Sequence, residues 1–150
     1  MIEFPTAEKL ASLVSNVTQT MFNISFQAII PQESAPHLIW RTVLLPIPGK
    51  DPITVGLSSD LQGCTKLGSA MFQVPLESVD QSMMDDSLCE LANMTAGLLK
   101  STLALDQALG LPKIIPNADP RVAAATNDPR LTLLRAREIG LILWVFHGAV

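Results

Sequence analysis

The chain has 150 residues, of which 48% are hydrophobic and 16% are charged, and its formal net charge is −4. This length suits a single domain over residues 1–150. The low charge content indicates either apolar surface buried between subunits or a well-filled core, and neither interpretation is favoured. The ten Lys and Arg residues are scattered, which argues against a nucleic-acid partner.

The N-terminus and the apolar runs indicate a cytoplasmic protein with no membrane segment. The opening "MIEFPTAEKL" lacks the basic and apolar regions of a secretory signal. The longest apolar run, 141–146, is far below the ~20 residues that a membrane-spanning helix needs. Cys64 and Cys89 stand in no paired motif, so they fit small buried thiols in a reducing compartment better than a disulfide.

The first part of the chain predicts a helix followed by strands. Thr6 can cap a helix whose apolar residues continue at helical spacing to Met21. Alternating or β-rich apolar runs then predict three strands, separated by a proline-containing loop and by the turn signal PGKD. In order, these segments are strand 23–30, loop 31–37, strand 38–47, turn 48–51 and strand 52–59.

The second part predicts two helices and a C-terminal hairpin. A short helix is expected near 61–73 and a long one from about 80 to 108, ending before Gly110 and Pro112. Residues 112–129 read as irregular chain with a short strand at 113–115 or 121–126, and two final strands meet near 138–140. This order predicts a two-layer α+β fold, in which a largely antiparallel β-sheet packs against helices.

The long helix carries polar residues along one side. At 100° per residue, Asp86, Glu90, Asn93, Gly97 and Lys100 fall within an arc of about 80°, and leucines occupy the opposite side. A glycine within a helix destabilises it by about 1 kcal/mol relative to alanine. At an exposed position this loss has no compensating benefit, unless the missing side chain allows another molecule to approach closely. These residues therefore predict a surface that receives a partner; the alternative is a solvated helix back.

The spacing of these residues resembles a family signature. Asp86, three residues, Glu90, two residues, Asn93, then 22 residues and Pro116 is similar to the pattern of the CheX/CheC/FliY chemotaxis phosphatases. The wording "ELANMTAG" is also close to that of CheX-like sequences. The resemblance implies a CheX/CheC-like fold and hydrolysis of the aspartyl phosphate on CheY, the response regulator that controls the flagellar motor.

The resemblance also implies a role for each motif residue. Asn93 resembles the residue that enters the regulator's site and orients the attacking water, and Glu90 resembles the one that pairs with a regulator lysine. Asp86 and Pro116 match the outer anchors, where a structural role is expected. No cofactor of its own is implied, because Mg²⁺ and the charge-stabilising groups belong to the phosphorylated CheY-like regulator.

A single site is expected, because the first helix has Ala11 and no asparagine three residues after Glu8. This departure from CheC-type sequences favours a CheX-like chain, for which the resemblance implies a homodimer. Two other classes remain open. The chain could be a non-catalytic chemotaxis or flagellar-switch module that binds a regulator without hydrolysis, or a dimerising structural domain with no regulator partner.

Other constellations in the sequence are weaker. His37 and His147 have no supporting ligands at metal-binding spacing, and His147 reads as a strand-end residue. No nucleophile elbow is present, and residues 56–63 lack the glycine spacing and Lys–Ser/Thr ending of a phosphate loop. Trp40 and Trp144 are expected in the core or in a dimer interface.

Overall fold

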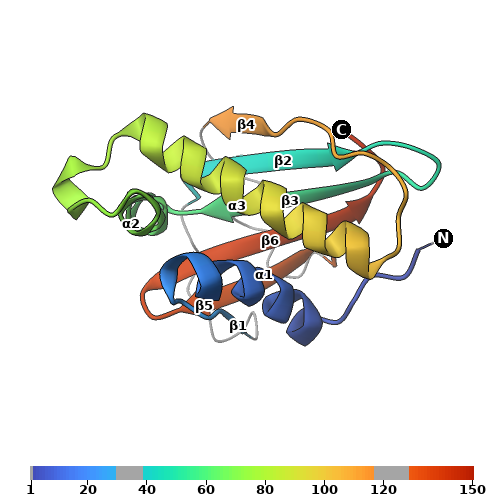
Figure 1. The fold of residues 1–150 in the computed structure, drawn as a ribbon, viewed down its shortest axis with the longest axis horizontal. Helices are drawn as coiled ribbons and strands as arrows, with labels where there is room; N and C mark the ends of the chain where they lie inside the picture. The colour runs from blue at the N-terminus through green and yellow to red at the C-terminus, as the bar shows by residue number, and fades with distance from the viewer. Residues whose placement is uncertain (1, 30–38, 117–128) are drawn as a thin grey trace.

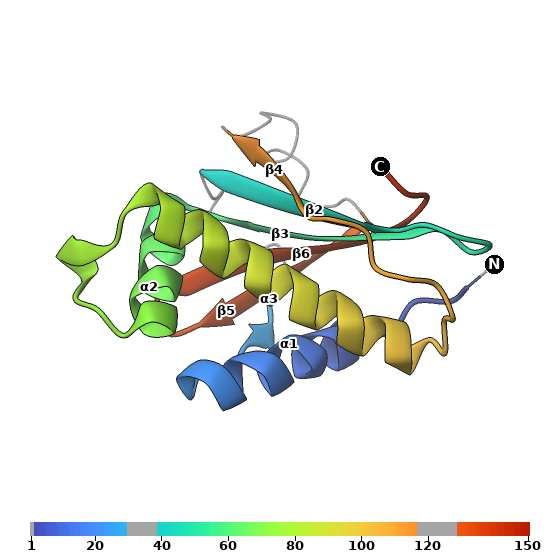
Figure 2. The ribbon, with the colours of Figure 1, turned by 45° about the horizontal axis from the view of Figure 1, so that its top comes forward.

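The computed structural model describes residues 2–29, 39–116 and 129–150. Within these residues, helices pack on one face of a six-stranded antiparallel sheet (Figures 1 and 2), which confirms the expected two-layer α+β fold. The elements are α1 (Ala7–Phe22), β1 (Gln27–Ala28), β2 (Arg41–Ile47), β3 (Ile53–Ser59), α2 (Leu61–Phe72), the 3-10 turn η2 (Leu76–Ser78), α3 (Gln81–Thr102), β4 (Lys113–Pro116), β5 (Leu131–Ala136) and β6 (Ile139–His147).

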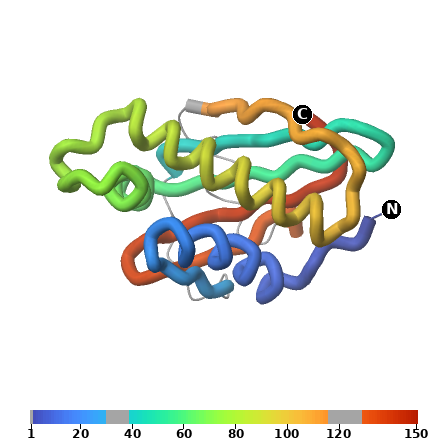
Figure 3. The backbone as a smooth tube through the Cα atoms, in the orientation of Figure 1, coloured from blue at the N-terminus to red at the C-terminus, as the bar shows by residue number. Residues whose placement is uncertain are grey.

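The strands follow the order β1-β5-β6-β3-β2-β4, and every neighbouring pair is antiparallel. Two tight hairpins, β2–β3 and β5–β6, supply the four inner strands, as the sequence predicted. Figure 3 shows how the chain leaves β3, forms α2 and α3, and returns to the sheet as the edge strand β4. The long excursion between β3 and β4 is therefore what places α3 over the sheet.

The main core lies between the sheet and the helices. Alternate residues of β2, such as Val43 and Leu45, face the helical layer and are fully buried, as are Val55 and Leu57 of β3. A smaller cluster occupies the other side of the sheet and includes Trp144, whose Nε1 donates to Ser58 Oγ at 3.0 Å. The core option for this tryptophan is thus confirmed.

Each helix begins at a side-chain cap. Thr6 accepts a hydrogen bond from the Lys9 N–H at 3.3 Å, as the sequence predicted. Asp60 and Asp80 cap α2 and α3 in the same way, and Asp80 accepts from the third residue of α3 at 2.9 Å. In the part of the chain that the structure describes, none of the helices has the length and apolarity that a membrane crossing requires.

The prediction that the long helix reaches residue 108 is wrong. α3 ends at Thr102, and Ala104 adopts a left-handed conformation with φ of 54°. The Leu105 N–H donates to the Lys100 carbonyl at 3.0 Å, which closes the helix in a Schellman-type turn. Glycine is the usual residue at this left-handed position, so an alanine gives no stop signal in the sequence.

Gln107 explains why the chain after α3 leaves the helical path. Its Oε1 accepts from the Asp51 N–H at 3.0 Å, and its Nε2 donates to the carbonyls of Ile47 at 3.2 Å and Asp51 at 2.7 Å. These bonds satisfy backbone groups of the β2–β3 turn, so a tertiary contact replaces the helix that the apolar spacing predicted.

One further segment differs from expectation, and another matches one of two alternatives. Within the described part of the strand predicted over 23–30, only Gln27–Ala28 form a strand, after Asn23 ends α1 in a left-handed conformation. The 112–129 region supplies a full edge strand, β4, where the 113–115 alternative was expected. The loop 31–37 and the 121–126 alternative lie outside the described residues.

Thr95 and Thr18 form a matched pair for testing the core. Both are buried, but among the described residues the Thr95 hydroxyl has no hydrogen-bond partner, whereas Thr18 donates to the Ile24 carbonyl at 2.6 Å. We expect Thr95→Val to raise the free energy of unfolding by about 1 kcal/mol and Thr18→Val to lower it by about 1 kcal/mol. Urea denaturation measures both, and changes of equal sign would contradict this account.

Candidate functional site

Apart from Lys100, the sequence singled out five residues, and the outer face of α3 carries four of them. The helix lies on the outside of the helical layer (Figure 1), where Asp86, Glu90 and Asn93 are exposed and Gly97 is half-buried. We call these four residues the docking strip. Lys100, also half-buried, lies at its C-terminal end.

Burial of the opposite face fixes the direction in which the docking strip points. Leu88 and Leu91 are fully inaccessible to solvent, and Leu99 is nearly so. Each such side chain contributes roughly 1.5–3 kcal/mol when it is buried, so rotating α3 about its axis would be costly. Met94, which the sequence reasoning left aside, borders the docking strip and is exposed.

Gly97 has no packing reason within the described residues to lack a side chain. A Cβ placed there would meet nothing within 4 Å. Gly68 in α2 differs, since its Cβ would lie 2.8 Å from Val79 Cγ1. Gly97 therefore leaves a bare patch of helix backbone in line with Glu90 and Asn93, as the partner interpretation requires.

Pro116, the fifth residue, lies on β4 and is paired with Arg41 of β2. Arg41 in turn contacts α3, because its Nε donates to Asp85 Oδ1 at 2.8 Å. Its guanidinium also stacks over the Trp40 ring, 4.1 Å from the centroid. Sequence reasoning missed Arg41, since its partner is 44 residues away and no local pattern marks the pair.

The two thiols are Cys64, buried in α2, and Cys89, which lies beside the docking strip on α3. Burial raises the pKa of Cys64 to about 12, with Asp60 and Asp85 adding to the shift and Arg41 opposing it. Burial also raises the pKa of Cys89, the residue before Glu90, and nearby Asp85 and Asp86 raise it further. Neither free thiol is therefore an activated nucleophile.

The docking strip does not lie in a cleft with metal-binding groups. Among the described residues, no cluster of three or more His, Cys, Asp or Glu is placed to hold a metal ion. His147 ends β6 and stacks on Phe4 with ring centroids 4.4 Å apart, as expected for a strand-end residue, and His37 lies outside the described residues. The strip is thus an exposed helix surface, which suits contact with another macromolecule.

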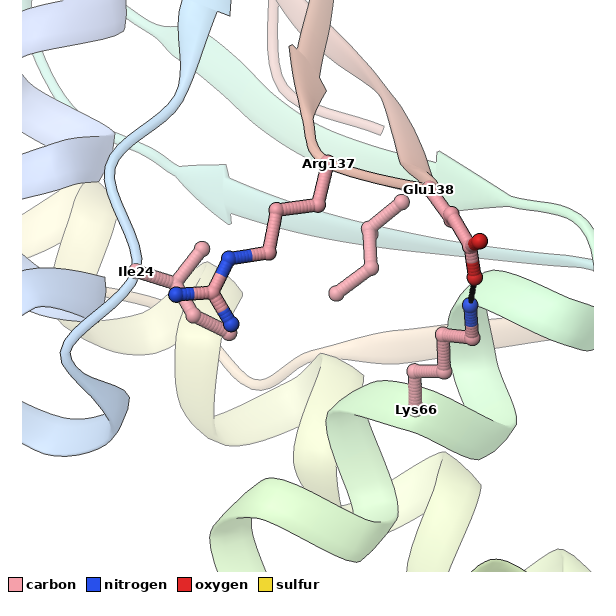
Figure 4. A pocket seen from close by; sticks show the side chains of 5 residues that line it. Ile24, Lys66, Arg137 and Glu138 are labelled. Carbon is pink, nitrogen blue, oxygen red and sulfur yellow. Dashed lines mark hydrogen bonds and ion pairs between the residues drawn. The ribbon is translucent and has the colours of Figure 1, made fainter.

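A separate pocket lies at the turn between β5 and β6 (Figure 4), and α3 contributes no lining residue. Lys66 of α2 pairs with Glu138 at one side, while Arg137 extends toward Ile24. The two cationic groups point apart, so they do not converge on a common ligand position.

Comparison with known families gives one match, to the model described as "Chemotaxis phosphatase CheX", over residues 42–134. This range covers more than half of the chain and contains the docking strip and Pro116. The chain belongs to the CheX family. The resemblance in the motif is therefore confirmed at the level of the family, although comparison with curated proteins gives no match.

Solved structures of CheX-like proteins share the fold. A chemotaxis protein of Desulfovibrio vulgaris Hildenborough is similar with a TM-score of 0.69 and 12% identity, covering 95% of this chain and 96% of the other. CheX of Vibrio vulnificus gives 0.67 and 13%, covering 93% of each chain. A CheX–CheY–BeF₃–Mg²⁺ complex from Borrelia burgdorferi gives 0.64 and 14%, covering 95% and 99%. At these identities the likeness shows the CheX fold alone.

Gly97 offers a direct stability test of the docking strip in this CheX-family chain. We expect Gly97→Ala to raise the free energy of unfolding by about 0.5–1 kcal/mol, because alanine favours the helix and its methyl group meets nothing within 4 Å. Gly68→Ala is the matched control and should destabilise, since its methyl group collides with Val79. Chemical denaturation measures both; a destabilised Gly97→Ala would show an unrecognised internal role.

Proposed function

We propose that this chain dephosphorylates the aspartyl phosphate of a CheY-like response regulator in the cytoplasm. Asn93 orients the hydrolytic water, and Glu90 anchors a lysine of the regulator. The single observation that carries the proposal is the exposed docking strip, in which an acid and an amide three residues apart share one face of a helix beside a bare glycine.

An exposed asparagine suits this reaction chemically. An acyl phosphate is already activated, so the remaining requirement is to place water in line with the phosphorus, as a glutamine does in some GTPases. A carboxamide has both donor and acceptor groups for that task and needs no shifted pKa. Mg²⁺ is expected on the regulator, and Asn93 on a protruding face can enter another protein's site.

A CheY-like partner is supported by the family and by one similar structure. The matching family model is that of a chemotaxis phosphatase, and the Borrelia complex holds CheX together with CheY. A homodimer is part of the proposal as well, supported by the low charge content and by Ile114 and Ile115, which are exposed on the edge strand β4.

The second candidate is a non-catalytic module that binds a regulator without hydrolysis. The observation that favours it is that a similar fold occurs outside the CheX family. The FliM middle domain of H. pylori is similar with a TM-score of 0.52 and 9% identity. The fold therefore does not select between the two functions. The exposed amide of Asn93 supports hydrolysis, because binding alone has no need of a group that orients water.

Asn93→Ala is expected to reduce the catalysed rate of phosphate release by about 100-fold or more, since water positioning is lost. Binding to the regulator should change by less than about twofold, because the loss is confined to the reacting water. Stopped-flow phosphate release and a binding titration separate the two effects. Asn16→Ala, at an exposed asparagine of α1, is the matched control. Undiminished release by the Asn93 variant would refute the mechanism.

Glu90→Lys is expected to weaken regulator binding by about tenfold or more, because a charge that attracts a lysine becomes one that repels it. Glu8→Lys, an exposed acid on α1, should leave binding unchanged. A titration against the phosphorylated regulator at fixed ionic strength measures both. If the two variants bind the regulator alike, Glu90 does not anchor it. If the parent does not bind the regulator either, the chain is better described as a structural domain without a regulator partner.

Gly97→Ala adds a contrast between stability and activity. The same methyl group that stabilises the helix should obstruct the regulator's approach, so the regulator concentration for half-maximal rate should rise while the free energy of unfolding also rises. If Gly97→Ala has the parent rate at low regulator concentration, the regulator does not approach the helix closely at Gly97.

A further inference from the structure

Arg41 is a buried cation at the junction of three elements. Its side chain is 6% exposed, it begins β2, it binds Asp85 of α3, and it lies opposite Pro116 of β4. A buried charge must be compensated, and the 2.8 Å bond to the Asp85 carboxylate does so. The cation–π contact with the Trp40 ring further restricts where the guanidinium can lie.

Stability alone does not account for such a pair. An apolar pair of similar volume is often as stabilising as a buried ion pair, because desolvation offsets the Coulomb attraction. An ion pair, however, has defined donor and acceptor positions, so it fixes geometry that apolar packing leaves adjustable. The Arg41–Asp85 bond thus restrains both the rotation of α3 and its shift along the sheet.

The restraint acts next to the docking strip. Asp85 directly precedes Asp86, and Asn93 follows eight residues later, roughly 12 Å along the helix. Over this distance a helix is stiff, so a rotation at Asp85 carries over to Glu90 and Asn93.

The pairing of Arg41 with Pro116 also gives the spacing of the motif a structural basis. The motif's outer residues are Asp86 on α3 and Pro116 on β4. These two residues are 30 positions apart in sequence. Arg41 contacts the neighbour of the first and pairs with the second across the sheet. Arg41 is therefore related to both ends of the motif, through its side-chain bond to Asp85 beside Asp86 and through its backbone register with Pro116.

We propose that Arg41, through Asp85, is a positioning residue that holds α3 at the rotation and height at which Glu90 and Asn93 meet the phosphorylated regulator. This role rests on the proposed function. Arg41 touches neither the water nor the phosphoryl group, so its removal displaces the docking strip without deleting any group from it.

The test is the double variant Arg41→Met/Asp85→Leu, which replaces the ion pair with apolar side chains. The folded fraction and free energy of unfolding, followed by circular dichroism, should stay close to those of the parent. The turnover number per folded molecule should fall at least tenfold, because small displacements of a water-orienting group are costly. Arg41→Lys, which retains the charge, should keep at least about a third of the parent turnover.

The surface pair Lys66–Glu138 supplies the matched control, since it joins α2 to the β5–β6 turn away from the docking strip. Lys66→Met/Glu138→Gln should leave turnover unchanged. Parent-like turnover in the Arg41→Met/Asp85→Leu variant would overturn the positioning role, as would an equal loss in folded Arg41→Lys. If the double variant does not fold, Arg41→Gln replaces it. Its turnover number per folded molecule should likewise fall at least tenfold, while Arg41→Lys should keep at least about a third of the parent turnover.

Asn93→Ala in the same assay separates the two claims. If the parent itself does not accelerate phosphate release, the proposed dephosphorylation is wrong and the positioning role falls with it. If the parent is active and Asn93→Ala retains its rate, Asn93 does not orient the water and Arg41 has no such group to position. If Asn93→Ala loses activity while the folded Arg41 variants keep theirs, only the positioning role is wrong.

Discussion

The apolar side of α3 is buried against the sheet and against α1 and α2, and most of what is distinctive about this molecule depends on that packing. Leu88 and Leu91 are fully inaccessible to solvent, so the opposite side of the helix must face outward. Asp86, Glu90 and Asn93 are on that side. The docking strip is therefore a helix surface that the packing of α3 directs outward.

The proposed function divides the chemistry between two proteins. The docking strip contains an acid, an amide and a bare stretch of backbone, and the neighbouring thiols have raised pKa values that make them poor nucleophiles. Hydrolysis of an activated phosphate needs from this chain only a placed water and a docking contact. Membership of the CheX family is consistent with that division, because its model is that of a chemotaxis phosphatase.

Local patterns predicted much of the fold. Thr6 as a cap, the PGKD turn and the C-terminal hairpin depend on neighbouring residues, and the structure has all three. The end of α3 could not be predicted, because Ala104 takes a conformation usually reserved for glycine and Gln107 is bound to a turn more than 50 residues earlier. Long-range contacts, unlike caps and turns, leave no local signature.

The site shows the same distinction. Helical spacing placed Asp86, Glu90, Asn93 and Gly97 on one face, and the structure has them there, while their roles and the domain assignment for residues 1–150 stay predictions. The sequence did not predict a role for Arg41, because no pattern in the β-strand that it begins indicates a bond to Asp85. Pro116 entered through a family pattern, and only the sheet register relates it to the helix.

The most direct measurement is the lifetime of the phosphoryl group on CheY-like response regulators, with and without this chain at substoichiometric concentration. The account predicts that the chain shortens the lifetime and turns over many times, with a rate that saturates as the regulator concentration rises. Binding of the phosphorylated regulator with no change in that lifetime would contradict it, and would assign the docking strip to recognition alone.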